Sequence, residues 1–158
     1  MSSNLPSIRT EPTLADIRMD SEKYPRLYAV GPAHAVTELS KIVADAFLYK
    51  GQTADPANVK FIATALREEL LRDSAYGLRY ITMEEIRRTV RKAVLTADDF
   101  FINVSSLYKV LLSYARKEGR AADAEANALL KARKAAGTTA PAVDNIFNKY
   151  ATQLTKRQ

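Results

Sequence analysis

The stretch ITMEEIRRTVRKAVL, residues 81–95, decides which fold this chain can adopt. Thr82 stands just before an amphipathic run and Glu85 follows three residues later, which is the spacing of a helix-capping box. Ile81 before the cap and Ile86 at the fourth helical position have the spacing of a hydrophobic staple. Capping of this kind stabilises a helix start by about 1–2 kcal/mol. The sequence therefore predicts an amphipathic helix that begins at residue 83.

This predicted helix has two unlike sides. Its inner side consists of apolar residues that recur every three or four positions, namely Met83, Ile86, Val90, Ala93 and Val94. The opposite side carries two like-charged i,i+4 pairs, formed by Arg87, Arg88, Arg91 and Lys92. Each such pair costs an isolated helix a few tenths of a kcal/mol. The basic side is therefore a candidate surface for an external anion, although it could equally serve as the solvated side of a bundle helix.

The same helical period recurs along the chain, while the alternating period of a strand is almost absent. It predicts one helix over residues 33–49, a second that begins at Asp55-Pro56, and another over residues 104–118. Gly119 is expected to end the last of these, as the other glycines end theirs. Between the helices, Phe100, Phe101 and Ile102 are expected to anchor to the core, or to form a short strand. The fold class is therefore an all-α bundle of about four core helices.

The two ends of the chain differ from this core. Prolines punctuate residues 1–32, which we expect to form an arm with one short helix at 13–19, capped by Thr13 and Asp16. Three apolar residues of the arm should lie on the core: Tyr24, Leu27 and Tyr28. Residues 33–119 form the predicted core domain, and residues 120–158 a C-terminal helical extension. Its first part is alanine-rich and can bury little, so we expect an exposed helix. Its last part is amphipathic and could contact either its own core or a partner through Ile146, Phe147, Tyr150 and Leu154.

The sequence lacks the residue patterns that a metal site, a catalytic site or a phosphate-binding loop would need. There is no cysteine and one histidine, His34, so disulfides, thiolate metal sites and histidine-based relays have no basis. The five glycines lie too far apart for a phosphate-binding loop. Carboxylate pairs such as Glu84-Glu85 occupy adjacent helical positions, which point about 100° apart and do not converge on one substrate. We therefore predict a protein that is not an enzyme and needs neither metal nor cofactor.

The charge of +6 is unevenly spread along the chain. Residues 1–58 hold six Lys/Arg against seven Asp/Glu, a net of −1, whereas residues 59–158 hold eighteen against eleven, a net of +7. Basicity concentrated in one part favours a polyanionic partner, although extra lysines also serve solubility. The candidate nucleic-acid-binding residues are Arg87, Arg88, Arg91, Lys92, Arg116, Lys117 and Arg120. Tyrosines near basic residues, namely Tyr76, Tyr80, Tyr108 and Tyr114, could stack on bases or pack within the bundle.

Four segments together resemble a known group of proteins. They are PTLADI at residues 12–17, VKFIATALREELL at 59–71, ITMEEIRRTVRKAV at 81–94 and LYKVLLSYARKEGR at 107–120. Their order resembles small all-helical proteins coded by phages and mobile elements of Bacteroides-type bacteria, some similar to helicase loaders or replisome organisers. The chain departs from them at residues 96–104, where TADDFFINV stands in place of a Gly-Lys-Tyr-Gly-like turn. The resemblance implies an accessory role in DNA replication.

Two hypotheses about function follow. The first is a non-enzymatic phage or mobile-element accessory protein that binds nucleic acid or a replication protein through its basic helical faces. The alternative is a virion structural protein or assembly adaptor that acts through protein–protein contacts, with a homo-oligomer left open. Residues 1–17 lack the apolar stretch of a signal peptide, and no apolar run approaches the length of a membrane span. The expected location is therefore the cytoplasm of a bacterial host or a virion.

Overall fold

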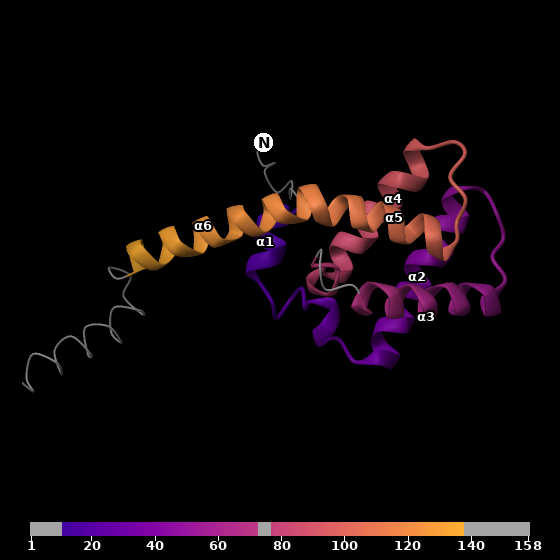
Figure 1. Cartoon of the computed structure of the whole chain (residues 1–158), viewed down its shortest axis with the longest axis horizontal. Coiled ribbons are helices and arrows are strands. Elements are labelled where there is room, and N and C mark those ends of the chain that lie inside the picture. Colours follow the sequence, from indigo (N-terminus) through magenta and orange to yellow (C-terminus); the bar gives the residue numbers. More distant parts are fainter. Residues whose placement is uncertain (1–10, 73–76, 138–158) are drawn as a thin grey trace, which may run out of the picture.

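The computed structural model describes residues 11–72 and 77–137, and this part of the chain is all-α without a strand, as predicted (Figure 1). The helices are α1 (Leu14–Met19), α2 (Pro32–Tyr49), α3 (Pro56–Arg72), α4 (Met83–Thr96), α5 (Val104–Tyr114) and α6 (Arg120–Gly137). Two short 3₁₀ turns, η2 (Leu27–Ala29) and η3 (Leu78–Tyr80), precede α2 and α4. The all-α prediction is confirmed.

Local signals explain where the helices begin. The Thr82 hydroxyl accepts the Glu85 amide while the Glu85 carboxylate accepts the Thr82 amide, so the predicted capping box of α4 is present. Thr13 and Asp16 form the corresponding box of α1. At α3 the Asp55 carboxylate accepts the Asn58 amide at 3.2 Å, and Pro56 occupies the first helical position. Each of these starts lies within one residue of its predicted place.

The core lies between α2, α3, α4 and α5. Its buried side chains include Leu39 and Val43 of α2, Ile62 and Leu66 of α3, Ile86 and Val90 of α4, and Leu107 and Leu111 of α5. Burying one such side chain stabilises the fold by roughly 1.5–3 kcal/mol. The predicted inner side of α4 is confirmed for Ile86, Val90 and Val94, which are buried, and for Met83, which packs against this core, whereas Ala93 is half-buried.

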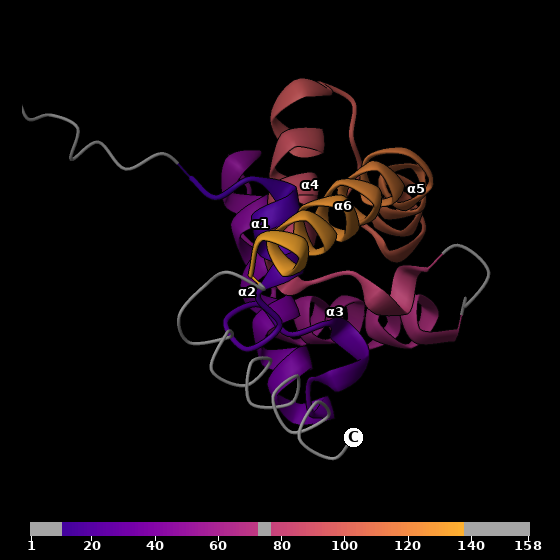
Figure 2. The same ribbon diagram turned by 90° about the vertical axis from the view of Figure 1, so that its left-hand side faces the viewer.

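The N-terminal segment packs on the bundle. In Figures 1 and 2, α1 lies beside the first half of α6, and Ala15 and Ile17 of α1 are buried. Leu27 is also buried, and its amide donates to the Ile81 carbonyl at 2.7 Å. Tyr28, however, is 52% exposed, so the prediction that it lies on the core is wrong. The reason is that η2 turns only one apolar side chain, that of Leu27, toward the core.

Gly119 does not end a helix, which corrects the prediction made from its position. A π-helical segment, η4 (Ala115–Gly119), joins α5 to α6, so the helix continues from Val104 to Gly137. The predicted boundary between residues 119 and 120 falls inside this helix, which we call the long helix. Gly119 is buried, and a Cβ there would stand 3.2 Å from Nη2 of Arg18. Close approach of the Arg18 side chain, rather than helix termination, is what this glycine allows.

The segment before α5 also differs from expectation. Phe100 and Ile102 are half-buried and pack against the core, but Phe101 is 76% exposed and residues 100–102 form no strand. Successive side chains of extended backbone point to opposite sides, so burying Phe100 and Ile102 turns Phe101 outward. Asn103 then caps α5 by accepting the Ser106 amide at 2.8 Å.

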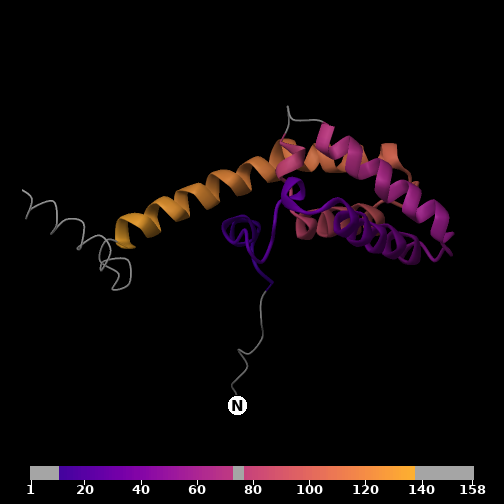
Figure 3. The same cartoon turned by 90° about the horizontal axis from the view of Figure 1, so that it is seen from below.

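Beyond Ala126, α6 projects from the bundle and its described side chains are exposed, as predicted (Figure 3). Within the part of the chain that the structure describes, no helix is long and apolar enough to cross a membrane. Several predicted contact residues lie outside the described residues: Tyr76, Ile146, Phe147, Tyr150 and Leu154.

Candidate functional site

Two of the basic residues of α4 already contact carboxylates. Arg87 pairs with Glu84, and the Nε of Arg88 lies 2.7 Å from the other oxygen of the same carboxylate. Arg88 also donates to the Pro12 carbonyl at 2.9 Å and lies 3.8 Å from Glu11. Glu84 thus offsets the charge of both arginines, and this part of the predicted nucleic-acid surface is weaker than the sequence suggested.

The other two cations of α4 are more available. The guanidinium carbon of Arg91 lies 5.9 Å from the centre of the Tyr49 ring, an exposed cation–π contact. Lys92 is exposed and lies within salt-bridge distance of no carboxylate in the described residues. These two side chains keep the positive charge that an external anion would meet.

The long helix carries a second group of cations. Lys109, Arg116 and Lys117 line one pocket of about 330 Å³ on it. Farther along, Arg120, Lys131 and Lys134 are separated by eleven and three residues, close to three turns and one turn, so they share one side of α6. Among the described residues, none of these last three has a carboxylate within 4.0 Å. We call Arg120, Lys131 and Lys134 the α6 cation row.

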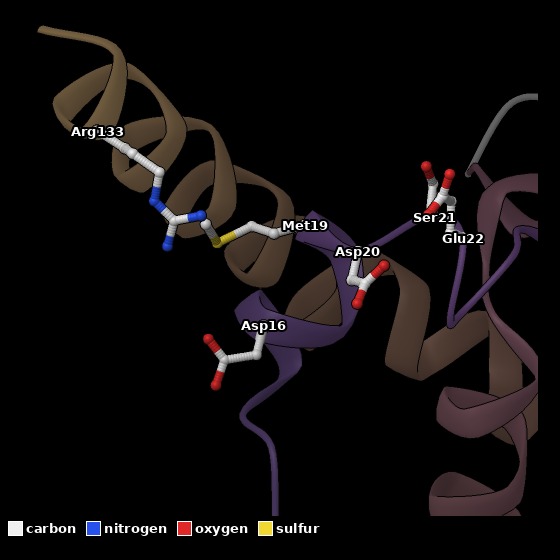
Figure 4. A pocket seen from close by; sticks show the side chains of 6 residues that line it. All are labelled: Asp16, Met19, Asp20, Ser21, Glu22 and Arg133. Carbon is white, nitrogen blue, oxygen red and sulfur yellow. The ribbon is translucent and has the colours of Figure 1, made fainter. Parts of the chain in front are cut away.

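The side of α6 that faces α1 is different. A pocket of about 490 Å³ lies there, and its lining includes the carboxylates of Asp16, Asp20 and Glu22 (Figure 4). Figure 4 shows Arg133 of α6 and Asp16 of α1 at this pocket. No group of acidic or histidine residues in the described part of the chain could hold a metal ion. This acidic side would repel a polyanion, so the two sides of α6 have opposite electrostatic character.

Behind the surface, Glu85 sits at the centre of a buried charge cluster. Its Oε1 accepts hydrogen bonds from Arg18, at 2.9 Å from Nε and 2.7 Å from Nη2, and another from the Tyr114 hydroxyl. Its Oε2 accepts from the Thr82 amide at 3.2 Å and from the Thr82 hydroxyl at 3.0 Å. Asp123 of α6 completes the cluster, 2.8 Å from Nη1 of Arg18. The cluster ties α1, the start of α4 and both parts of the long helix together.

The electrostatics of this cluster favour one protonation state. Burial by itself would lower the pKa of Arg18, but hydrogen bonds and charges of Glu85 and Asp123 raise that pKa above its usual value. Burial, and then the hydrogen bond to the Glu85 carboxylate, raises the pKa of Tyr114 well above its usual value. Tyr114 therefore stays a neutral donor. Since both carboxylate oxygens of Glu85 already accept hydrogen bonds, the cluster is suited to holding the fold rather than to proton transfer.

The sequence revealed only one part of this cluster. Thr82 and Glu85 were predicted as a local cap, but Arg18 lies 67 residues before Glu85 and Tyr114 lies 29 residues after it. No local pattern marks Arg18 or Asp123 as its partners. The one available signal was that Glu85 caps a helix start flanked by Ile81 and Ile86, the two apolar residues of the staple.

An exposed aromatic pair lies near this cluster. The rings of Tyr28 and Tyr80 are 5.3 Å apart between centroids and meet at 75°, edge to face. The guanidinium carbon of Arg79 lies 5.9 Å from each ring centre. The other tyrosines of interest differ, because Tyr114 is buried and Tyr108 half-buried. Of these three, only Tyr80 is exposed enough to stack on a base.

Comparison with known proteins gives no match to a family model, a curated protein or a solved structure. The function therefore has to be argued from the chain's own residues.

Proposed function

We propose that the protein is a non-enzymatic accessory protein that binds nucleic acid through its basic helical faces, as the phage and mobile-element proteins that it resembles would imply. The observation that supports this most directly is the α6 cation row. None of its three side chains lies within 4.0 Å of a carboxylate of the described residues, and α6 projects from the bundle (Figures 1 and 3). A cation without an internal partner gains more from a phosphate than one that must first leave a carboxylate.

The dimensions of the row suit a nucleic-acid backbone. Arg120 and Lys134 are fourteen residues apart, which is about 21 Å along a helix at 1.5 Å per residue. Lys117, three residues before Arg120, lines another pocket of the long helix together with Lys109 and Arg116. A strand lying along this side would meet several phosphates in succession. Arg91 and Lys92 of α4 remain predicted contributors on the bundle itself.

The test is the salt dependence of binding to a fluorescently labelled DNA duplex, measured by anisotropy. For the wild-type chain we expect affinity to fall steeply with salt concentration, because each phosphate contact releases counterions. The triple variant Arg120→Ala/Lys131→Ala/Lys134→Ala should lower the slope of log K against log salt by about 2–3. A flat slope, or no binding at low salt, would contradict the proposal.

A matched control variant distinguishes binding at the α6 cation row from an effect of the protein's net charge. Lys23, Lys41 and Arg72 are exposed cations outside the candidate nucleic-acid-binding residues, and Lys41 and Arg72 each pair with a carboxylate three residues earlier. Replacing these three by alanine removes the same formal charge as the triple variant in α6. We expect a much smaller change of slope, and equal changes in the two variants would mean that only the overall charge matters.

A second function, protein–protein contact within an assembly, is favoured by a different surface. Large apolar side chains are exposed near the ends of α2 and α4, including Leu48, Leu95 and Phe101. Lys50 ties these ends together, since its Nζ donates to the carbonyls of Ala97 and Asp98 at 2.9 Å. Exposed apolar side chains gathered on one part of a surface are typical of association sites. Light scattering of the wild type and of Leu48→Ser/Phe101→Ser tests it: a strict monomer in both would argue against self-association.

A further inference from the structure

We propose that Tyr28 and Tyr80, with Arg79 beside them, form a stacking site for an unpaired nucleobase, so that the ligand of this protein includes single-stranded nucleic acid. This inference rests on the proposed nucleic-acid binding and names the kind of strand that is bound. It adds a site, here called the tyrosine platform, which consists of Tyr28, Tyr80 and Arg79.

The tyrosine platform is both exposed to solvent and held in place by its backbone. Tyr28 is 52% and Tyr80 45% exposed, although large aromatic side chains gain free energy by burial. Each ring stands on a short 3₁₀ turn that is anchored by a fully buried leucine, Leu27 or Leu78. The amide of Leu27 also donates to the Ile81 carbonyl at 2.7 Å, which joins the two turns. Rings that are already ordered lose little entropy when a flat ligand stacks on them.

The two rings lie near cations that form no ion pair with a described residue. The Arg79 guanidinium contacts both rings and forms no ion pair with any described residue. Tyr80 and Arg120 line the same pocket, of about 190 Å³, together with Gly77. Asp123 also lines it, but this carboxylate lies 2.8 Å from Arg18 and 3.7 Å from Arg26, which offset its charge. The surroundings therefore favour an aromatic ligand that carries negative charge.

The tyrosine platform adjoins the α6 cation row. Arg120 is the first member of the α6 cation row and also lines the pocket at Tyr80. One strand could thus place its phosphates along α6 and a base on the platform. In a duplex the bases stack on one another and cannot present a face to a side chain, whereas unpaired bases can. Aromatic stacking is tolerant of base identity, so little sequence preference is expected.

The decisive experiment compares two probes, a labelled short oligothymidylate and a labelled duplex of equal length, at one low salt concentration. The variant Tyr28→Ala/Tyr80→Ala should weaken oligothymidylate binding about tenfold or more, since stacking contributes that much per base. Duplex binding should stay within about twofold. The variant Tyr28→Phe/Tyr80→Phe should bind oligothymidylate nearly as well as the wild type, because the ring rather than the hydroxyl makes the stack.

A control variant removes exposed aromatic area elsewhere. Phe61 of α3 is 66% and Phe101 76% exposed, so Phe61→Ala/Phe101→Ala makes a comparable change of surface. It should leave both probes bound as in the wild type. A result independent of variants comes from ultraviolet crosslinking of the wild-type chain to oligothymidylate, with crosslinked peptides identified by mass spectrometry. Crosslinks at Tyr28 or Tyr80 are expected, and crosslinks found only elsewhere would overturn the inference.

The remaining outcomes separate this inference from the proposed function. If the chain binds duplex with steep salt dependence but the tyrosine variants bind oligothymidylate like the wild type, the platform inference is wrong and the proposed function stands. The platform would then be a contact site for another partner, such as a protein. If the wild-type chain binds neither probe at low salt, both proposals fail together.

Discussion

Arg18 and Arg120 line the same pocket, yet they belong to two regions that use positive charge in opposite ways. Arg18 is buried, and its guanidinium is shared between Glu85 and Asp123. Arg120 is exposed and has no carboxylate within 4.0 Å among the described residues. In the first region the cation holds helices together, and in the second it is exposed to solvent. Counting arginines along a sequence cannot separate these two uses.

The basic side of α4 lies between these extremes. Arg87 and Arg88 share Glu84, so part of their charge is neutralised on the surface. Ion pairs near a protein surface contribute little to stability, roughly 0–1 kcal/mol, and a strong external anion could displace them. We therefore expect variants of the buried charge cluster to change the unfolding free energy, and variants of the α6 cation row to change nucleic-acid binding.

The largest effect is expected from Glu85→Ala. This change removes the carboxylate that faces Arg18 and leaves a guanidinium buried with Asp123 as its remaining anion, which should cost about 3–5 kcal/mol of unfolding free energy. Urea unfolding followed by circular dichroism measures it. Glu84→Ala is the control on the adjacent residue, and it should cost less than about 1 kcal/mol, because Arg87 is exposed and Arg88 keeps its hydrogen bond to the Pro12 carbonyl. Equal losses in the two variants would remove the distinction between the two regions.

A smaller effect is expected from Tyr114→Phe. The variant deletes a buried hydrogen bond to an ionised carboxylate, which should lower the unfolding free energy by about 1.5–3 kcal/mol near neutral pH. Because its pKa is raised in the folded state, Tyr114 contributes its stability fully below about pH 10 and loses it as the pH rises further. Unfolding of the wild type between pH 9 and 11 should therefore show a decline that Tyr114→Phe lacks. A parallel decline in both proteins would contradict this assignment.

Gly119→Ala tests the close approach at the centre of the long helix. Alanine is favoured over glycine within a helix by about 1 kcal/mol, so an unconstrained site would become more stable. Here the new Cβ would stand 3.2 Å from Nη2 of Arg18, and we expect a net loss of about 1 kcal/mol instead. A thermal melt measures whether the substitution raises or lowers the stability. Ala124→Gly, an exposed position of α6, is the control and should lose about 1 kcal/mol through helix propensity alone.

The smallest effect on stability is expected from the α6 cation row. Arg120→Ala/Lys131→Ala/Lys134→Ala should leave the unfolding free energy within about 0.5 kcal/mol of the wild type, because these side chains are exposed. The same protein sample should show the reduced salt dependence of duplex binding proposed above. A large loss of stability would instead mean that these cations stabilise the fold, as Arg18 does.

Much of the fold was readable from the sequence because its signals are local. The capping box and staple of residues 81–86 act within two helical turns, and the apolar period of α2, α3 and α4 is visible in any window of that length. Phe101 and Tyr28 were misassigned for the same reason. Their hydrophobicity is a local property, but which of several neighbouring apolar residues reaches the core depends on backbone direction.

The candidate site was less readable. The sequence predicted Arg116, Lys117 and Arg120 as a basic cluster, and the first two line one pocket while Arg120 lines another. It could not show that Glu84 pairs with both Arg87 and Arg88, or that the α6 cation row is exposed to solvent. It also could not bring Tyr28 to Tyr80, which are separated by 52 positions, because side-chain pairing between distant segments follows from packing.

By itself the sequence determined an all-α chain, the starts of its helices and the apolar side that each turns inward, since hydrogen-bonding caps and helical periodicity operate between near neighbours. The tertiary structure alone decided which charged side chains form ion pairs with one another and which stay exposed to solvent. Ion pairing between Arg18 and Glu85, the π-helical continuation through Gly119 and the exposure of the tyrosine platform all depend on contacts between distant segments. Such contacts are selected by the shape and dielectric environment of the packed bundle.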